Sequence, residues 1–342
     1  SQDAAPSPKP HHSTGLCPMR RAGRRALLVA ATGGHLEQIT RLEPRLSPAF
    51  DEIEYATFDD QQSRSLLEGR PVHHVLRIPP RGYKQVLQVA PAAWNIVRRG
   101  GYSDVISTGS AIAMPFLAAA RLTGARAHYV ESAARSDRPS LTGRTVARIP
   151  GINLYTQYTS WADQRWQWHG SVFDPFVLGD HERAVDSASR VVVTLGTMRS
   201  YPFRRAVQAI KNVLSEVAKP DVEVLWQVGD TPVDDLGIVG HNLIPARELN
   251  DAMHESDLVF AHAGIGSCLQ VLDSGRAPVL LPRRSAQGEH IDDHQLLIAA
   301  ELEARDLAVS RDPYELTAED AISAMHRQVT VTGTPRPFEL VS

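Results

Sequence analysis

Apolar positions along the chain fall into two kinds of pattern, which alternate from one end to the other. Short continuous apolar runs predict buried strands, and longer stretches with an apolar residue at every third or fourth position predict amphipathic helices. Strands that alternate with helices favour a parallel sheet covered by helices, so an α/β fold is expected. In the first half the expected strands are 26–31, 52–57, 74–78, 104–107 and 127–130, and the expected helices lie near 35–46, 84–99 and 111–123.

The same alternation starts again in the second half. Strands are expected at 190–195, 222–228, 242–244, 258–260 and 278–281, and helices at 203–217, 246–255, 267–274, 292–302 and 317–328. A segment rich in aromatic and turn-forming residues, with Trp166, Trp168 and Gly170, separates the two series. The expected organisation is a flexible leader over 1–23, an N-terminal domain over 24–165, a linker over 166–187, a C-terminal domain over 188–330 and a tail over 331–342.

Composition agrees with two cytoplasmic domains. The length of 342 residues is about twice that of a typical domain. A formal net charge of −3 argues against a dedicated nucleic-acid binder. The two cysteines, Cys17 and Cys268, lie in unlike contexts, so we expect a reducing compartment and no disulfide framework. No apolar run approaches the roughly 18 residues of a membrane-spanning helix, and the N-terminus has no signal-peptide core.

The segment 260–267 carries the clearest chemical signal. Its apolar strand ends in glycines that open a helix, so free backbone N–H groups and the positive helix end point at one spot, which suits a pyrophosphate. The downstream segment 281–295 supplies uncharged and acidic groups for sugar hydroxyls. Together the two segments predict a nucleotide-sugar site.

Two further glycine turns follow predicted strands. The turn 32–35 leaves the first strand and ends in His35, which at a helix start is well placed as a general base. The turn at Gly196 and Thr197 follows the first strand of the second series. In facing doubly wound domains the carboxyl ends of both sheets surround one cleft, so we expect the turns to share a site.

In combination these motifs resemble a known family. The segments 33–35, 130–135 and 140–143 are similar to the membrane-recruiting subunit of the eukaryotic two-part N-acetylglucosaminyltransferase of dolichol-linked oligosaccharide synthesis, and 190–310 look like its catalytic partner. The order of the two halves is that of MurG-like enzymes, and 282–295 resembles bacterial capsule and exopolysaccharide glycosyltransferases of family 28. The resemblance implies a GT-B fold, in which two doubly wound Rossmann-like domains face a central cleft.

The resemblance also implies roles for individual residues. The C-terminal domain would hold a UDP-sugar, with Ile244 presenting its backbone to uracil, and the N-terminal domain would hold the acceptor. The implied donor-binding residues are Gly196, Thr197, Ile244, His262, Gly264, Gly266, Ser267, Gln270, Glu289, Asp293, His294 and Gln295, and the implied acceptor-binding residues are Gly33, Gly34 and Arg135. Gln270 departs from the pattern, because related enzymes often place there a Glu that grips both ribose hydroxyls; an amide binds a hydroxyl less strongly than a carboxylate does.

The expected reaction is an inverting displacement of UDP by an acceptor hydroxyl. His35 is the first candidate base and Glu131 the second, although Glu131 could instead form an ion pair with Arg135. The sequence has no Asp-x-Asp triplet, so we expect a metal-independent enzyme without a cofactor, in which helix N-termini and histidines stabilise UDP. His290 and His294 have a spacing that suits zinc, but no further ligand set accompanies them.

The acceptor is suggested by the segment 77–99. Its apolar residues include Leu87 and Trp94 and are flanked by cations, which would suit peripheral contact with an anionic membrane. This predicts a lipid-linked acceptor, an undecaprenyl-pyrophosphate saccharide of exopolysaccharide or cell-envelope glycan synthesis, at the inner face of the membrane. An ordinary amphipathic helix packed on its own sheet is the alternative, and a hydrophobic small-molecule natural product would then be the acceptor.

Other classes of protein remain open at this point. A UDP-sugar epimerase could use the same two-domain fold and donor site without an acceptor. A non-catalytic scaffold would recruit a partner to the membrane and show no turnover. An NAD-linked oxidoreductase is disfavoured, because neither glycine turn gives Gly-x-Gly-x-x-Gly with an acidic residue about 20 positions later.

Overall fold

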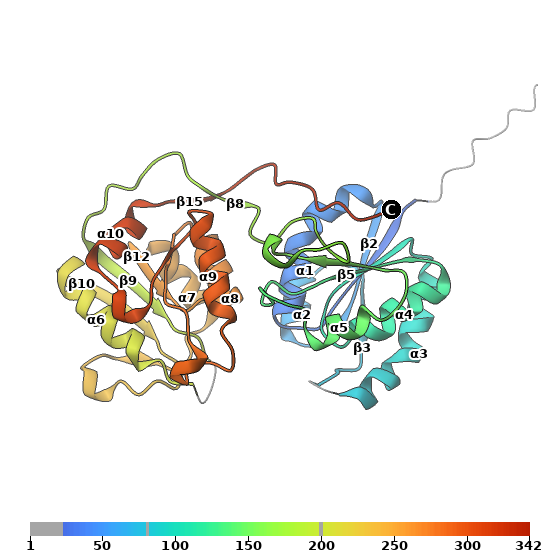
Figure 1. Cartoon of the computed structure of the whole chain (residues 1–342), viewed down its shortest axis with the longest axis horizontal. Coiled ribbons are helices and arrows are strands. Elements are labelled where there is room, and N and C mark those ends of the chain that lie inside the picture. Colours follow the sequence, from blue (N-terminus) through green and yellow to red (C-terminus); the bar gives the residue numbers. More distant parts are fainter. Residues whose placement is uncertain (1–22, 80–81, 198–200) are drawn as a thin grey trace, which may run out of the picture.

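The computed structural model describes residues 23–79, 82–197 and 201–342 and places two α/β domains next to each other (Figure 1). The N-terminal domain is built on a seven-stranded parallel sheet in the order β3-β2-β1-β4-β5-β6-β7. Its elements are β1 (Arg25–Ala30), α1 (Gly34–Leu46), β2 (Glu52–Phe58), α2 (Gln61–Leu66), β3 (Val72–Val75), α3 (Tyr83–Gly100), β4 (Asp104–Gly109), α4 (Ala113–Thr123), β5 (Arg126–Val130), α5 (Leu141–Val146), β6 (Ile152–Thr156) and β7 (Trp166–Trp168).

The C-terminal domain repeats this architecture with a six-stranded parallel sheet in the order β11-β10-β9-β12-β13-β14. Its elements are β9 (Ala188–Thr194), α6 (Arg204–Val217), β10 (Ala218–Gln227), β11 (Gly240–His241), α7 (Ala246–Glu255), β12 (Leu258–Ala261), α8 (Ile265–Asp273), β13 (Val279–Leu280), α9 (His294–Ala304), β14 (Val309–Ser310) and α10 (Ala318–His326). Each sheet therefore has the doubly wound order that the alternating pattern predicted, and the expected α/β fold is confirmed.

Buried apolar residues form layers on both faces of each sheet. One layer packs α3 and α4 against the N-terminal sheet through residues such as Phe116 and Leu117. Another packs α6 and α10 against the C-terminal sheet, with Ile210 and Met325. The opposite face of the N-terminal sheet is covered by α1, and that of the C-terminal sheet by α7, α8 and α9. The buried residues of these helices form one apolar cluster that extends from one domain to the other. No helix among the described residues is long and apolar enough to cross a membrane.

The expected bounds of the N-terminal domain and of the linker need correction. Strand β7 begins at Trp166 and pairs in parallel with β6, so the first residues of the expected linker 166–187 belong to the N-terminal sheet. The sequence did not predict this strand, because three residues rich in tryptophan carry no periodic signal. The rest of the segment includes β8 (Phe176–Leu178), which pairs antiparallel with β15 (Val329–Val331).

The C-terminal tail 331–342 crosses back to the N-terminal domain (Figure 1). Phe338 is 3% exposed, and its ring centroid lies 5.5 Å from that of Tyr155. The Val341 N–H donates to the Tyr155 hydroxyl at 2.9 Å. The chain thus connects the domains twice, once through β8 and once through the tail.

Candidate functional site

The crevice between the domains is where the two sheets direct their carboxyl-end loops. In the N-terminal sheet, β1 and β4 are neighbours, and the helices that follow them, α1 and α4, cover opposite faces of the sheet. In the C-terminal sheet, β9 and β12 are neighbours, and the helices that follow them, α6 and α8, also cover opposite faces. Ligands of open α/β sheets bind outside such switch points. The predicted glycine turns follow β1, β9 and β12, so all three lie at these positions.

His35 lies in the first turn of α1 and is held by a main-chain group. Its Nδ1 lies 2.7 Å from the Thr108 carbonyl oxygen, and the Thr108 hydroxyl donates to the His35 carbonyl at 2.8 Å. A carbonyl oxygen can only accept, so Nδ1 carries the proton and Nε2 keeps its lone pair. Burial, and to a smaller extent the charge of Arg135, lower the pKa of His35 below its ordinary value. His35 is therefore a neutral imidazole with an available acceptor nitrogen.

Gly33 and Gly34 form an exposed turn before α1. Gly33 has φ +96°, which an L side chain rarely adopts. The Gln62 amide, from α2, accepts from the Gly33 N–H and donates to the Gly33 carbonyl. The Gly33 N–H is therefore already occupied, and the turn has less capacity to bind an anion than the sequence suggested.

Glu131 differs from its predicted place in the cleft. The side chain is buried, with 1% of the residue exposed, and its carboxylate accepts from the Ser140 N–H and hydroxyl at 2.9 and 3.0 Å and from the Ser132 N–H at 3.0 Å. Burial raises its pKa, and these hydrogen bonds oppose the rise. The predicted Arg135 ion pair is not among the contacts of this carboxylate. Glu131 holds the loop between β5 and α5 in shape.

The first turn of α8 opens onto unfilled space, as expected of a phosphate-binding loop. No side chain caps this helix, and the N–H groups of Ile265, Gly266 and Ser267 precede the first helical hydrogen bond, which the Cys268 N–H makes to Gly264. A Cβ at Gly266 would have no atom within 4 Å. Three donors and the positive end of the helix therefore face a space that an anion could fill.

His262 borders this turn, and glycines make room for its ring. A Cβ built on Gly196, whose φ is +82°, would lie 2.8 Å from His262 Nε2, and a Cβ on Gly264 would also collide with the ring. The same nitrogen lies 3.0 Å from the Ser267 hydroxyl. The structure thus brings Gly196, His262, Gly264 and Ser267 together, and their binding of a donor stays a prediction. Thr197 follows Gly196 and is exposed.

Gln295 and Glu289 are buried instead of facing a sugar. Gln295 is 4% exposed and bonds to the backbone of Ala263 and Arg283 and to the ring of His262. The Glu289 carboxylate accepts from Nε and Nη2 of Arg205, at 2.9 and 3.0 Å. Both residues brace loops of the C-terminal domain, so the predicted sugar contacts need correction.

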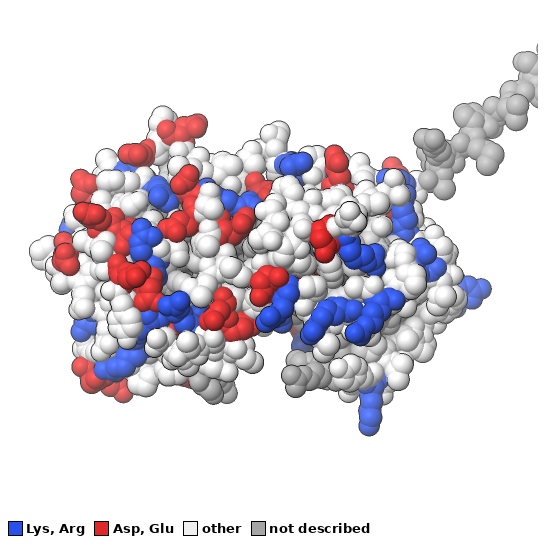
Figure 2. Space-filling view, viewed as in Figure 1, with Lys and Arg blue, Asp and Glu red and all other residues white. Residues whose placement is uncertain are grey.

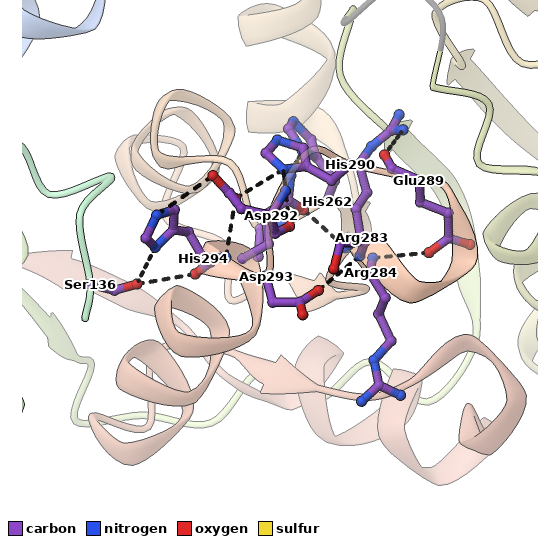
Figure 3. Close-up of polar contacts among 12 residues, drawn as sticks. Ser136, His262, Arg283, Arg284, Glu289, His290, Asp292, Asp293 and His294 are labelled. Carbon is purple, nitrogen blue, oxygen red and sulfur yellow. Dashed lines mark hydrogen bonds and ion pairs between the residues drawn. The ribbon is translucent and has the colours of Figure 1, made fainter. Parts of the chain in front are cut away.

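His294 joins the two domains (Figure 3). Its Nε2 lies 3.1 Å from the Arg135 guanidinium and 3.5 Å from the Asp292 carboxylate, and its Nδ1 faces Asp137 at 3.3 Å. The Ser136 hydroxyl donates to the His294 carbonyl at 3.3 Å. A residue predicted to contact the donor therefore contacts the loop of the opposite domain, next to the predicted acceptor residue Arg135.

The remaining predicted donor residues lie at the edge of the site. The Ile244 N–H donates to the Gln227 side chain at 2.8 Å, so it is not free for a base, although no described residue donates to the Ile244 carbonyl. The Gln270 amide donates to Asn250 on α7 at 2.6 Å. Asp293 is exposed and accepts from the Ser285 N–H at 2.8 Å, which lowers its pKa. In the described part of the chain, no three His, Cys, Asp or Glu side chains gather in a way that could hold a metal.

Sequence reasoning missed Arg283, which is central to the site. Its guanidinium is buried and donates to the carbonyls of Leu195 at 2.6 Å and Glu289 at 3.0 Å, and it lies 4.9 Å from the Phe203 ring centroid. Arg283 thereby ties the loop after β9 to the loop after β13, and burial lowers its pKa to about 10. An arginine in a polar loop gives no sequence signal that distinguishes this buried place from a solvated one.

The molecular surface is hollowed between the two domains, at the lower edge of the view in Figure 2. Basic side chains outnumber acidic ones on the visible face of the N-terminal domain, whereas the C-terminal domain shows a mixture of both. A separate cavity of about 730 Å³ opens between α1 and α2 and is lined by Thr40, Arg41, Asp60 and Gln62. Arg41 also pairs with Asp273 of α8 at 2.6 Å, so this cavity borders the C-terminal domain.

Comparison with known proteins shows that the chain is similar to glycosyltransferases. Residues 190–327 match the model of the glycosyltransferase family 28 C-terminal domain. The chain is similar to the UDP-N-acetylglucosamine–N-acetylmuramyl-(pentapeptide) pyrophosphoryl-undecaprenol N-acetylglucosamine transferases of Chlorobaculum tepidum and Synechococcus sp. strain CC9311. Identity to the Chlorobaculum protein is 26% over 215 residues, or 58% of this chain and 57% of that protein. Identity to the Synechococcus protein is 26% over 322 residues, or 86% of each.

A solved structure shares the fold of both domains. The match to MurG from Acinetobacter baumannii has a TM-score of 0.55 and 17% identity, and it covers 86% of this chain and 88% of that chain. At this identity the likeness shows a common fold. It confirms the expected GT-B arrangement of two Rossmann-like domains.

Proposed function

We propose that this chain transfers a sugar from a UDP-activated donor to an acceptor bound by the N-terminal domain, and the match of residues 190–327 to the model of the glycosyltransferase family 28 C-terminal domain supports this. The observation that carries the proposal is the open first turn of α8 beside His262 and Ser267. It offers N–H donors and a positive helix end to the diphosphate of a donor. The same groups would stabilise the negative charge of the departing UDP.

The proposed reaction is an inverting displacement. The acceptor oxygen forms a bond to the anomeric carbon while the bond from that carbon to the UDP oxygen breaks. His35 accepts the hydroxyl proton on Nε2, since its Nδ1–H is committed to Thr108. Glu131 accepts hydrogen bonds from the loop between β5 and α5 and so holds this loop in place. Arg135, on the same loop, contacts His294 of the C-terminal domain. The charge of UDP is met by protein groups, so the proposal includes no metal ion.

The acceptor in this proposal is an undecaprenyl-pyrophosphate saccharide used to build exopolysaccharide or cell-envelope glycan. The names of the similar transferases specify a pyrophosphoryl-undecaprenol acceptor. Helix α3 buries Val89, Ala93 and Val97 against its own sheet. Its outer side exposes an apolar stripe at Tyr83, Leu87 and Trp94, with Leu87 74% exposed, and cations lie at Lys84, Arg98 and Arg99. Such a surface would hold the enzyme at an anionic bilayer, from which the acceptor is reached.

A donor and acceptor screen in the presence of a metal chelator tests the proposal. UDP-Glc, UDP-Gal, UDP-GlcNAc and UDP-GlcA are each titrated into the protein, and UDP release is measured with and without an undecaprenyl-pyrophosphate saccharide in anionic vesicles. We expect one donor to bind and UDP to be released only with the acceptor. Turnover of the donor alone would indicate an epimerase, release only with a soluble hydrophobic acceptor would replace the lipid acceptor, and loss of activity in chelator would contradict metal independence.

A further inference from the structure

The orientation of the Gln295 side-chain amide is fixed by the main chain. Its Oε1 lies 3.1 Å from the Ala263 nitrogen and 3.1 Å from the Arg283 nitrogen. Both backbone groups can only donate, so the atom between them is the oxygen, and the NH₂ group points the other way. That NH₂ group lies 3.2 Å from His262 Nδ1 and donates to it.

The amide in turn fixes the proton on His262. Because Nδ1 accepts from Gln295, the ring proton of the neutral imidazole resides on Nε2. Nε2 is 3.0 Å from the Ser267 hydroxyl oxygen, which must then accept from the ring. The hydroxyl hydrogen of Ser267 is left free to turn toward the open first turn of α8.

The surroundings of His262 keep the ring neutral. Burial lowers its pKa most, and the positive charge of Arg283 lowers it further, to about 3 despite the opposing hydrogen bond with Gln295. The flanking groups at Gly196 and Gly264 carry no charge. A ring with this pKa does not titrate in the neutral range, so the direction of its two hydrogen bonds stays constant there.

We propose that Gln295 is a positioning residue that acts through His262 to aim the Ser267 hydroxyl at the pyrophosphate of the donor. This inference rests on the proposed function, because it assigns the open turn of α8 to a diphosphate. It also accounts for an amide at position 295. A carboxylate there could only accept, so it would draw the ring proton to Nδ1 and oblige Ser267 to donate to Nε2 instead.

The first test reads the ring protons directly. ¹⁵N-histidine spectra of the ligand-free full-length protein, with His262 assigned by its loss in His262→Asn, report which ring nitrogen is protonated. We expect the proton on Nε2 in the wild type and on Nδ1 in Gln295→Glu at about pH 8.5. A wild-type ring protonated on Nδ1, or a Gln295→Glu ring still protonated only on Nε2, would overturn the proposal.

The second test uses UDP as the probe and pH as the variable. Gln295→Glu should bind UDP about tenfold more weakly than the wild type at about pH 8.5, since one hydrogen bond to the anion is lost. The ratio of the two Kd values should approach one near about pH 6, because a proton added to the carboxylate or to the ring restores the donor to Ser267. A ratio that does not change with pH would indicate a merely structural role and contradict the inference.

Two further variants separate the effect of an added charge on UDP binding from the effect of the lost coupling between Gln295 and Ser267. Gln287→Glu adds the same charge at an exposed position of the neighbouring loop and should leave UDP affinity unchanged at every pH. Ser267→Ala should weaken UDP binding in the wild type but by less than about twofold in Gln295→Glu at about pH 8.5; equal losses in both would overturn the coupling. If the wild type binds no UDP, the donor assignment fails, whereas the ligand-free spectra still decide whether Gln295 sets the His262 proton.

Discussion

Two histidines of the crevice are held in single neutral forms by neighbours whose hydrogen-bonding role cannot change. The Thr108 carbonyl fixes the Nδ1 proton of His35, and the Gln295 amide, itself fixed by two backbone N–H groups, leaves the proton of His262 on Nε2. The same side-chain type therefore offers an acceptor nitrogen in the N-terminal domain and a donor in the C-terminal domain. This difference suits a base on the acceptor side and an anion site on the donor side.

His35→Ala is predicted to lower kcat by a factor of about 10² to 10⁴, the usual contribution of a general base, with little change in UDP affinity. A base must be unprotonated to act. Because burial lowers the pKa of His35 below 6.5, activity should persist to a lower pH than an ordinary histidine would allow and fall only as the pH drops through that lowered pKa. Steady-state kinetics across pH measure kcat and its pH dependence. His326→Ala, a substitution in α10, is the control and should change neither. An unchanged kcat would remove His35 as the base.

At the scale of elements, the donor site depends on where strands end and helices begin. Strand β12 delivers His262, α8 begins three residues later without a side-chain cap, and β9 ends close enough that Gly196 contacts the His262 ring. Glycine is required at position 196 for two independent reasons, its positive φ and the lack of room for a Cβ.

Comparison of Gly196→Ala with Gly237→Ala separates these two reasons. Both residues have positive φ, +82° and +65°, so backbone strain alone should lower the free energy of unfolding by about 1 to 2 kcal/mol in each alanine variant. A Cβ at Gly237 has no atom within 4 Å, whereas at Gly196 it meets His262. Only Gly196→Ala should displace the ring and weaken UDP binding, by about tenfold or more. Urea unfolding and UDP titration measure the two effects, and equal UDP affinity in both variants would contradict this account of the loop.

At the scale of the whole molecule, the two domains are joined by more than a linker. Asp174 accepts from Arg45 of α1 at 2.7 Å and from Arg305, which follows α9, at 2.9 Å. Arg45 also donates to the Arg336 carbonyl of the returning tail at 2.6 Å. The Asp174 carboxylate and the guanidinium groups of Arg45 and Arg305 therefore tie together the linker, the tail and both domains.

Phe338→Ala tests how much the returning tail contributes. Truncating a buried phenylalanine typically costs about 3 to 5 kcal/mol, and Phe338 packs on Tyr155 of the N-terminal sheet. We expect a loss in that range in the free energy of unfolding of the N-terminal domain. Val331→Ala, at an exposed tail position, should change it by less than about 0.5 kcal/mol. Similar unfolding curves for the two variants would indicate that the tail lies loosely on the domain.

The sequence by itself determined the features that depend on near neighbours along the chain. Apolar spacing located β1, β9 and β12 and the helices that follow them, because burial imposes a period on each element separately. Glycines directly after these strands located the turns that place His35 and His262, since a tight turn and an open helix start are local properties. Helix α8 begins at Ile265, two residues before the predicted start at 267, and directly after the glycine turn that the sequence indicated.

Only the tertiary structure decided which polar residues are buried and which are free. Glu131, Glu289 and Gln295 have the composition of site residues, but their partners come from distant segments, such as Arg205, which is 84 positions from Glu289. The short strand β7 and the docking of Phe338 depend in the same way on surfaces that exist only after the sheets have formed. The sequence specifies the chemical groups of a side chain, whereas long-range packing determines whether that side chain is exposed to solvent. Exposure in turn determines whether a polar group can bind a ligand or instead stabilises a loop.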